Sequence, residues 1–178
     1  MALSNHERVG KALDLLRDGL KPFVEQELKS RHGDDWAAKV RDIVRETRLG
    51  AGKGESLQDV AMLLVVMDRS WGEVFRQTLG KADRSLVNEL LAVRNAWAHQ
   101  EPFSSDDADR ALDSIARLLT AVSASQADEV GKMKMELRRL IFDEQMRSEK
   151  RKSGGTAIES PTAAGLKPWR EVVNPHKD

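Results

Sequence analysis

Two side chains with complementary chemistry lie five residues apart in the middle of this 178-residue chain: Arg94 and His99. An arginine keeps its positive charge at physiological pH and offers planar hydrogen-bond donors to a phosphate. A histidine titrates near neutral pH, so it can remove or return a proton during a reaction. Asn95, next to the arginine, can orient the histidine or contact a phosphate. As a bare pattern the pair also arises by chance, because five helical residues turn about 500° and do not share a face.

The segment that carries this pair is predicted to be an amphipathic helix. Its apolar residues recur at helical spacing, so one face should enter a hydrophobic core: Leu86, Leu90, Val93 and Trp97. Pro102 follows closely, and the helix should therefore end near His99. The arginine and the histidine would then lie together near a helix end.

Similar apolar repeats predict the remaining helices, near residues 4–28, 36–44, 57–71, 105–122 and 126–152. The 57–71 helix, with Ser56 as a candidate cap, has a broad apolar face and should be central to the core. The glycine-rich connector at 50–54 lacks the spacing of a phosphate-binding loop. No alternating strand pattern and no repeat occurs. We therefore expect an all-α bundle of five to six helices, with an extended C-terminal helix and tail.

Composition narrows the class of protein. Hydrophobic residues make up 40% and charged residues 33%, which is typical of a soluble helical protein. The net charge is zero, so any nucleic-acid binding must come from a local patch. Cysteine is absent and no signal-like or membrane-spanning run occurs, so we expect a cytoplasmic protein without disulfides. We expect no metal and no cofactor, because the other histidines are scattered: His6, His32 and His176.

The C-terminal part changes character along its length. Between Lys132 and Lys152, eight basic residues occur against four acidic ones, which fits either a solvated helix face or a patch that binds a nucleic-acid backbone. Residues 153–165 are small and polar, which predicts a linker, and 166–173 become apolar again. We expect a helical domain, a basic helix, and a linker with the start of a further domain, at 1–125, 126–152 and 153–178.

The central sequence Arg94-Asn95-Ala96-Trp97-Ala98-His99 resembles the Arg-polar-x-x-x-His signature of the HEPN family (higher eukaryotes and prokaryotes nucleotide-binding domains). The resemblance runs from about Leu57 to Val122, and residues 67–71 look like a second family feature. The branch it resembles occurs in transcript-surveillance endonucleases and at the N-terminus of large prokaryotic phage-defence-type ATPases. Residues 166–176 resemble the start of such an ATPase. One departure is Glu101, where toxin-type members carry a tyrosine.

The resemblance implies a metal-independent endoribonuclease in phage defence, with Arg94, Asn95 and His99 as catalytic residues. RNA supplies its own nucleophile, the 2′-hydroxyl, so a proton acceptor and a charge stabiliser suffice to give 2′,3′-cyclic phosphate ends. The implied partners are RNA, a second copy of the chain in a homodimer, and a downstream ATPase domain. The alternatives are an inactive dimerisation or RNA-binding module of a larger ATPase, and a nucleotide sensor. Further RNA contacts are expected at Arg69, Lys132, Arg138 and Arg139.

Overall fold

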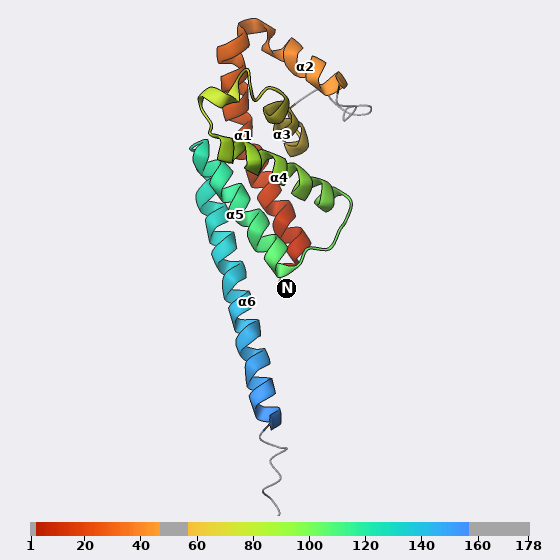
Figure 1. Ribbon diagram of the computed structural model, residues 1–178, viewed down its shortest axis with the longest axis vertical. Coiled ribbons are helices and arrows are strands. Elements are labelled where there is room, and N and C mark those ends of the chain that lie inside the picture. The colour runs from red at the N-terminus through yellow and green to blue at the C-terminus, as the bar shows by residue number, and fades with distance from the viewer. Residues whose placement is uncertain (1–2, 47–56, 157–178) are drawn as a thin grey trace, which may run out of the picture. The chain divides into compact units, whose positions relative to one another are not determined.

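The computed structural model describes residues 3–46 and 57–156, with side chains as far as residue 152 (Figure 1). The described residues form six α-helices and two short 3₁₀ turns, η1 (Gly33–Asp35) and η2 (Phe75–Gln77), and within them there is no β-strand. This confirms the all-α bundle of five to six helices expected from the sequence. The helices are α1 (Asn5–His32), α2 (Trp36–Glu46), α3 (Val60–Arg69), α4 (Lys81–Ala98), α5 (Ser105–Ala121) and α6 (Gln126–Thr156).

Local sequence determines where these helices begin. Three of them start after a side chain that accepts a hydrogen bond from a backbone N–H of the first turn: Ser4 for α1, Asp59 for α3 and Ser104 for α5. The expected cap of α3 was Ser56, which lies outside the described residues. Asp59 caps it instead, because its backbone is extended and its Oδ1 lies 2.9 Å from the Ala61 nitrogen. α4 starts after Gly80, whose N–H donates to Asp83 at 2.8 Å.

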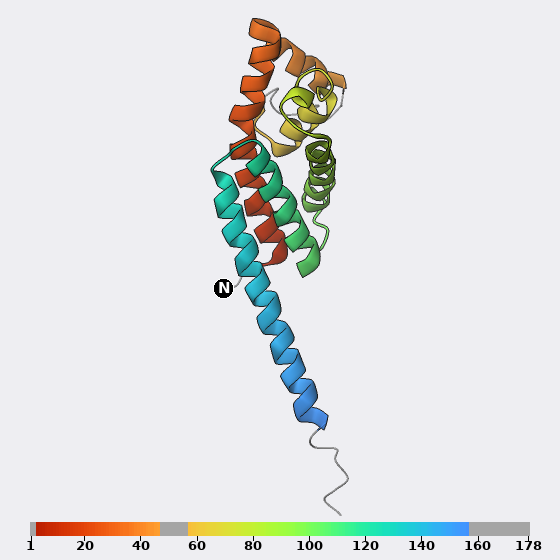
Figure 2. The same cartoon turned by 60° about the vertical axis from the view of Figure 1, so that its left-hand side comes forward.

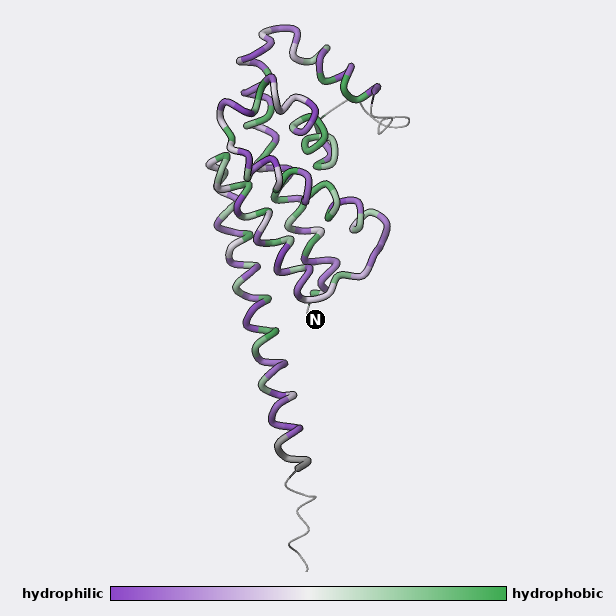
Figure 3. Tube along the Cα trace, in the orientation of Figure 1, coloured by the Kyte–Doolittle hydropathy of each residue, from purple (hydrophilic) through white to green (hydrophobic). Residues whose placement is uncertain are grey.

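One face of each helix builds the core of the first compact unit, Met1–Arg138. α1 packs against α5, α3 and α4, and it lies beside α5 in both views (Figures 1 and 2). Every residue from Val60 to Met67 in α3 is buried, and this helix is strongly hydrophobic along the chain trace (Figure 3). The prediction of a central core helix there is confirmed. α4 therefore rests on a rigid apolar support.

The sixth helix crosses from the first compact unit into the second, which begins at Arg139. In the first unit, Val130 and Leu137 of α6 are buried. α6 continues to Thr156, so it extends four residues into the segment that the sequence predicted to be a linker. That correction follows from the backbone, which keeps its helical hydrogen bonding beyond Lys152. The rest of the expected linker and the apolar segment after it lie outside the described residues.

Candidate active site

The helix that carries Arg94 and His99 is held in place by its buried face. Leu86, Val87 and Leu90 of α4 are buried, and α4 packs against α3 and α5. Burying a leucine or valine side chain contributes roughly 1.5–3 kcal/mol, so this face alone positions the helix firmly. The last turn of α4 lacks a fully buried residue and depends on a different set of contacts.

Those contacts join Trp97 to the start of α1. The Trp97 Nε1–H donates to the carbonyl oxygen of His6 at 3.2 Å, and the two rings stack with centroids 5.5 Å apart. The His6 Nε2 lies 3.0 Å from the Trp97 carbonyl oxygen, so this nitrogen carries the proton and donates. Gly10 lets the indole approach, because a Cβ there would lie 2.8 Å from Trp97 Nε1. The last turn of α4 is thereby fixed on α1.

Arg94 points from α4 toward the beginning of α3. Its Nη2 lies 2.7 Å from Oδ2 of Asp59, the residue that caps α3. The arginine side chain is 21% exposed and the aspartate 56% exposed. Both line a cavity of about 200 Å³ together with Asp14 and Arg17, so its charged lining is balanced. The sequence did not indicate this partner, which lies 35 positions before Arg94.

His99 ends the same helix and has a different environment. Its backbone N–H donates to the Asn95 carbonyl oxygen at 3.0 Å, and it caps α4 as the sequence predicted. The side chains of Asn95 and His99 are both exposed, and in the part of the chain that the structure describes neither has a hydrogen-bond partner. The next residue, Gln100, has a φ of 58°, which turns the chain away from the helix axis. The imidazole is therefore open to solvent.

The structure does not bring Arg94 and His99 into contact within one chain. Arg94 is bound to Asp59 on the α3 side, whereas the His99 side chain reaches solvent at the helix end. Asn95 is nearer the exposed face that His99 shares, since four helical residues turn about 400°. The three predicted catalytic residues thus lie within one and a half helical turns. In a single chain, however, Arg94 points in a different direction from Asn95 and His99.

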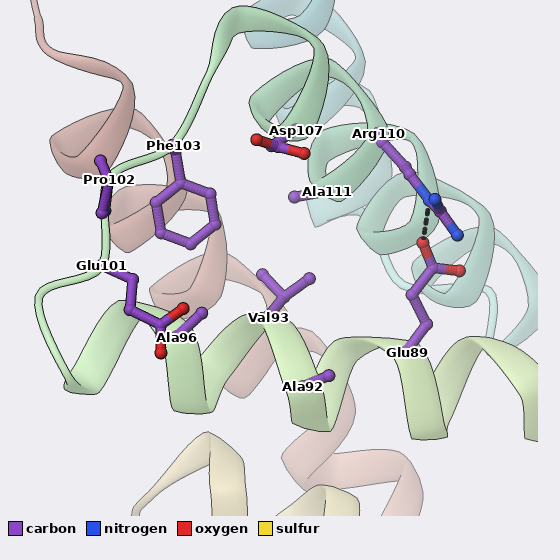
Figure 4. A pocket seen from close by; sticks show the side chains of 10 residues that line it. All are labelled: Glu89, Ala92, Val93, Ala96, Glu101, Pro102, Phe103, Asp107, Arg110 and Ala111. Atoms are coloured by element: carbon purple, nitrogen blue, oxygen red, sulfur yellow. Dashed lines mark hydrogen bonds and ion pairs between the residues drawn. The ribbon is translucent and has the colours of Figure 1, made fainter.

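An apolar groove lies between α4 and α5, on another side of α4 (Figure 4). This α4–α5 groove has a volume of about 340 Å³, and Ala92, Val93 and Phe103 point into it. Its rim is largely acidic: Glu89 pairs with Arg110 at 2.7 Å, and two further carboxylates follow, Glu101 and Asp107. Hydrogen bonds from the Ser104 hydroxyl and backbone lower the pKa of Asp107, which keeps that carboxylate ionised. Such a rim repels phosphate, so this groove does not suit RNA.

The predicted additional RNA contacts lie on two helices, α3 and α6. Arg69 ends α3 and is exposed, as is Lys132 on α6. Arg138 forms a two-pronged ion pair with Asp109 of α5, at 2.8 and 2.9 Å, and is therefore already partnered. The same contact lowers the pKa of Asp109. Arg139 is exposed and belongs to the second compact unit.

Two broader features of the structure bear on function. Across residues 3–46 and 57–156, no group of three or more His, Asp or Glu side chains is arranged to hold a metal ion. In the same ranges, none of the helices is both long enough and apolar enough to span a membrane.

Comparison with known proteins places this arrangement in a family. The sequence model of one family, Swt1-like HEPN, matches residues 11–123, which include α2 to α5 and both Arg94 and His99. Neither a curated protein nor a solved structure matches the chain. HEPN membership indicates a ribonuclease-type or nucleotide-binding function. The family match covers more than half of the sequence, and with the all-α bundle around α4 it leads to one conclusion: the chain belongs to the Swt1-like HEPN family.

Proposed function

We propose that this protein is a metal-independent endoribonuclease in which Arg94 and His99 carry the reaction and Asn95 assists. The observation that supports this most is the environment of the His99 side chain. Its imidazole is exposed at the end of α4 and has no hydrogen-bond partner among the described residues, although the helix beneath it is firmly anchored. A free titratable group on a rigid support is what proton transfer requires.

The proposed reaction uses the RNA as its own nucleophile. His99 removes the proton from a 2′-hydroxyl, whose oxygen attacks the adjacent phosphorus as the bond to the 5′-oxygen breaks. The guanidinium of Arg94 stabilises the negative charge that accumulates on the phosphate oxygens. A proton is returned to the departing 5′-oxygen, which gives a 2′,3′-cyclic phosphate and a 5′-hydroxyl. Asn95, on the turn between them, donates to the phosphate or holds the imidazole.

The ion pair of Arg94 with Asp59 is weak enough for a phosphate to replace it. Asp59 is more than half exposed. Exposed ion pairs contribute roughly 0.2–1 kcal/mol, so little free energy is needed to separate the two side chains. Arginine bonds well to phosphate through two parallel N–H donors. Asp59 therefore keeps Arg94 ordered without preventing it from binding RNA.

A homodimer would complete the site. One chain presents Arg94 and His99 in different directions, whereas a two-fold axis near the end of α4 would bring two copies of each residue to one cleft. In this arrangement the arginine of one copy can act with the histidine of the other. The cellular setting we propose is phage defence, with a downstream ATPase domain, and it rests on the resemblance of residues 166–176.

A catalytically inactive dimerisation or RNA-binding module is the second candidate. The α4–α5 groove favours the dimerisation module, because a cavity of about 340 Å³ with an apolar lining is available for protein contacts. In that case Arg94 and His99 would have no effect on RNA integrity.

Cleavage of total RNA in excess chelator decides between the two. We expect cleavage by the wild type, and losses of about 100-fold or more in both Arg94→Ala and His99→Ala. Arg45→Ala, which changes an exposed arginine on α2, is the matched control. A cyclic-phosphate end should appear only with active proteins. Folded His99→Ala protein with wild-type cleavage would reject the site.

Complementation tests the shared cleft. Arg94→Ala and His99→Ala subunits are mixed and allowed to exchange, and heterodimers are isolated by two different affinity tags. A shared cleft retains one arginine and one histidine in each heterodimer, so part of the activity should return. Heterodimers as inactive as their parents would exclude this arrangement.

A further inference from the structure

A third cavity lies at the opposite end of α4 from His99, and its chemistry differs from that of the other two. Its volume is about 540 Å³, which is within the range of small-ligand sites. Three cationic side chains line it, above a floor that includes the buried Trp71. We call this cavity the basic pocket and define it by Arg76, Lys81, Arg84, Ser85 and Asn88.

The charge of the basic pocket is not balanced by its lining, which contains no carboxylate. Arg84 has one acidic partner, Asp68, at a long distance of 3.4 Å. Arg76 and Lys81 are exposed, and neither has an ion-pair partner within the described ranges. Because the whole chain has a net charge of zero, this is a local excess of positive charge rather than a general property.

Neutral hydrogen-bonding groups accompany these cations. The Asn88 side chain is exposed, with no partner among the residues described, and the Ser85 hydroxyl makes only a 3.4 Å contact to the Lys81 carbonyl oxygen. Arginine, lysine, serine and asparagine side chains are the usual ligands of phosphodiester oxygens. The combination of unpaired cations and free amide and hydroxyl groups therefore fits the backbone of a nucleic acid.

One face of α4 connects the basic pocket to the proposed catalytic end. Seven exposed residues of α4 follow this face along the helix: Lys81, Arg84, Ser85, Asn88, Ala92, Asn95 and Ala98, with His99 at its end. The only two carboxylates of α4 are half-buried and engaged, Asp83 with Gly80 and Glu89 with Arg110. A polyanion that follows this face therefore meets no exposed carboxylate of α4.

We propose that the basic pocket binds the backbone of the RNA substrate at a distance from the bond that is cleaved. The inference rests on the proposed function, since it needs RNA as the substrate. Lys81 and His99 are 18 positions apart, which corresponds to about 27 Å along a helix. A strand bound at both ends of α4 thus spans several nucleotides. A two-fold contact near His99 leaves the basic pocket free, because it lies at the other end of the helix.

Binding can be measured without cleavage. The full chain carrying His99→Ala is titrated with a fluorescent single-stranded RNA at several salt concentrations. Adding Arg76→Gln, Lys81→Gln and Arg84→Gln should weaken binding on the order of tenfold or more. Three lost phosphate contacts should also reduce the slope of log K against log salt by about 2, at roughly 0.7 per contact. The matched control removes three exposed cations from α2, Lys39→Gln, Arg41→Gln and Arg45→Gln, and should change neither value.

Cleavage by the otherwise wild-type chain provides the second readout. In the basic-pocket variant, the ratio of kcat/KM for a 20-nucleotide RNA to that for a dinucleotide should fall by at least about tenfold, because only the longer RNA reaches both ends of α4. If no protein cleaves RNA, the proposed function fails while the binding experiment still decides the pocket. Equal affinity and salt slope in the basic-pocket and α2 variants would overturn the proposal. So would tighter binding of polyglutamate than of RNA, which would indicate an acidic protein partner.

Discussion

Replacing Gly10 by alanine tests how the last turn of α4, the proposed catalytic end, is held. Gly10 lies inside α1, where an added Cβ would be 2.8 Å from Trp97 Nε1 and 3.1 Å from two ring carbons. The indole cannot simply move aside, because it stacks on His6 and donates to its carbonyl oxygen. Gly10→Ala should therefore displace Trp97, and with it the last turn of α4.

The expected change in unfolding free energy combines three contributions. Alanine improves helix propensity by about 1 kcal/mol over glycine. Overpacking costs about 1–3 kcal/mol, and loss of the Trp97–His6 hydrogen bond about 0.5–1.5 kcal/mol. The net result is a destabilisation of roughly 0.5–3.5 kcal/mol by this sum. Gly131→Ala in α6 is the matched control, because a Cβ there meets nothing within 4 Å and only the gain in propensity, about 0.5–1 kcal/mol, remains.

Urea unfolding followed by helical circular dichroism measures both variants. The midpoint should rise for Gly131→Ala and fall for Gly10→Ala, with similar slopes. RNA cleavage by Gly10→Ala should fall as well, because Trp97 lies between Arg94 and His99 in the last part of α4. If Gly10→Ala proves as stable as Gly131→Ala, Trp97 has room to adjust, and the reasoning about its anchoring is wrong.

Two further predictions concern charged contacts. Asp59→Ala should lower stability by about 0.5–2 kcal/mol more than Asp59→Asn in thermal unfolding, because asparagine keeps the capping oxygen while both variants lose the ion pair with Arg94. Equal losses would show that the cap of α3 contributes little. The hydrogen bond from Arg138 lowers the pKa of Asp109 from its ordinary 3.8, so this stabilisation is complete above that value and is lost as the pH falls through the lowered pKa. Arg138→Gln should flatten the dependence of the melting temperature on pH below about 4, whereas Arg139→Gln should not. If the melting temperature of Arg138→Gln depends on pH below about 4 as strongly as that of the wild type, the contact between Arg138 and Asp109 does not cause this dependence.

The sequence predicted those features that depend on neighbouring residues. Pro102 and the apolar spacing before it located the end of α4 at His99, because a proline restricts the residues just ahead of it. Ser4 and Ser104 cap α1 and α5, and each has an acidic residue three positions later, which is a local signal of a capping box. The buried stretch of α3 followed from its dense apolar run. Each of these signals lies within about one or two helical turns.

The contacts that shape the site join distant segments, and no local pattern reveals them. Asp59 and Arg94 are 35 positions apart, and Trp97 and His6 are 91 apart. Asp59 falls within the helix predicted at 57–71, and no neighbouring residue marks it as the partner of Arg94. Arg138 belongs to a basic run of the sequence and was expected to contact RNA. In the folded chain it is bound to Asp109 of α5. The basic pocket likewise combines residues before and within α4 whose proximity depends on the turn at η2.

The direction of the Arg94 side chain is the main reason that the proposed site needs a second copy of the chain. Arg94 and His99 lie about 140° apart around the helix, and Arg94 is bound to Asp59 of α3. Breaking that exposed pair costs little, but a freed arginine still begins on a different side of α4 from the imidazole. In the proposed reaction, a phosphate at His99 is therefore more readily reached by the arginine of a second copy, across the exposed face of Asn95 and His99. In the proposed endoribonuclease Asp59 is therefore not an inhibitor: its contact with Arg94 keeps the arginine ordered until a phosphate of the RNA replaces the carboxylate.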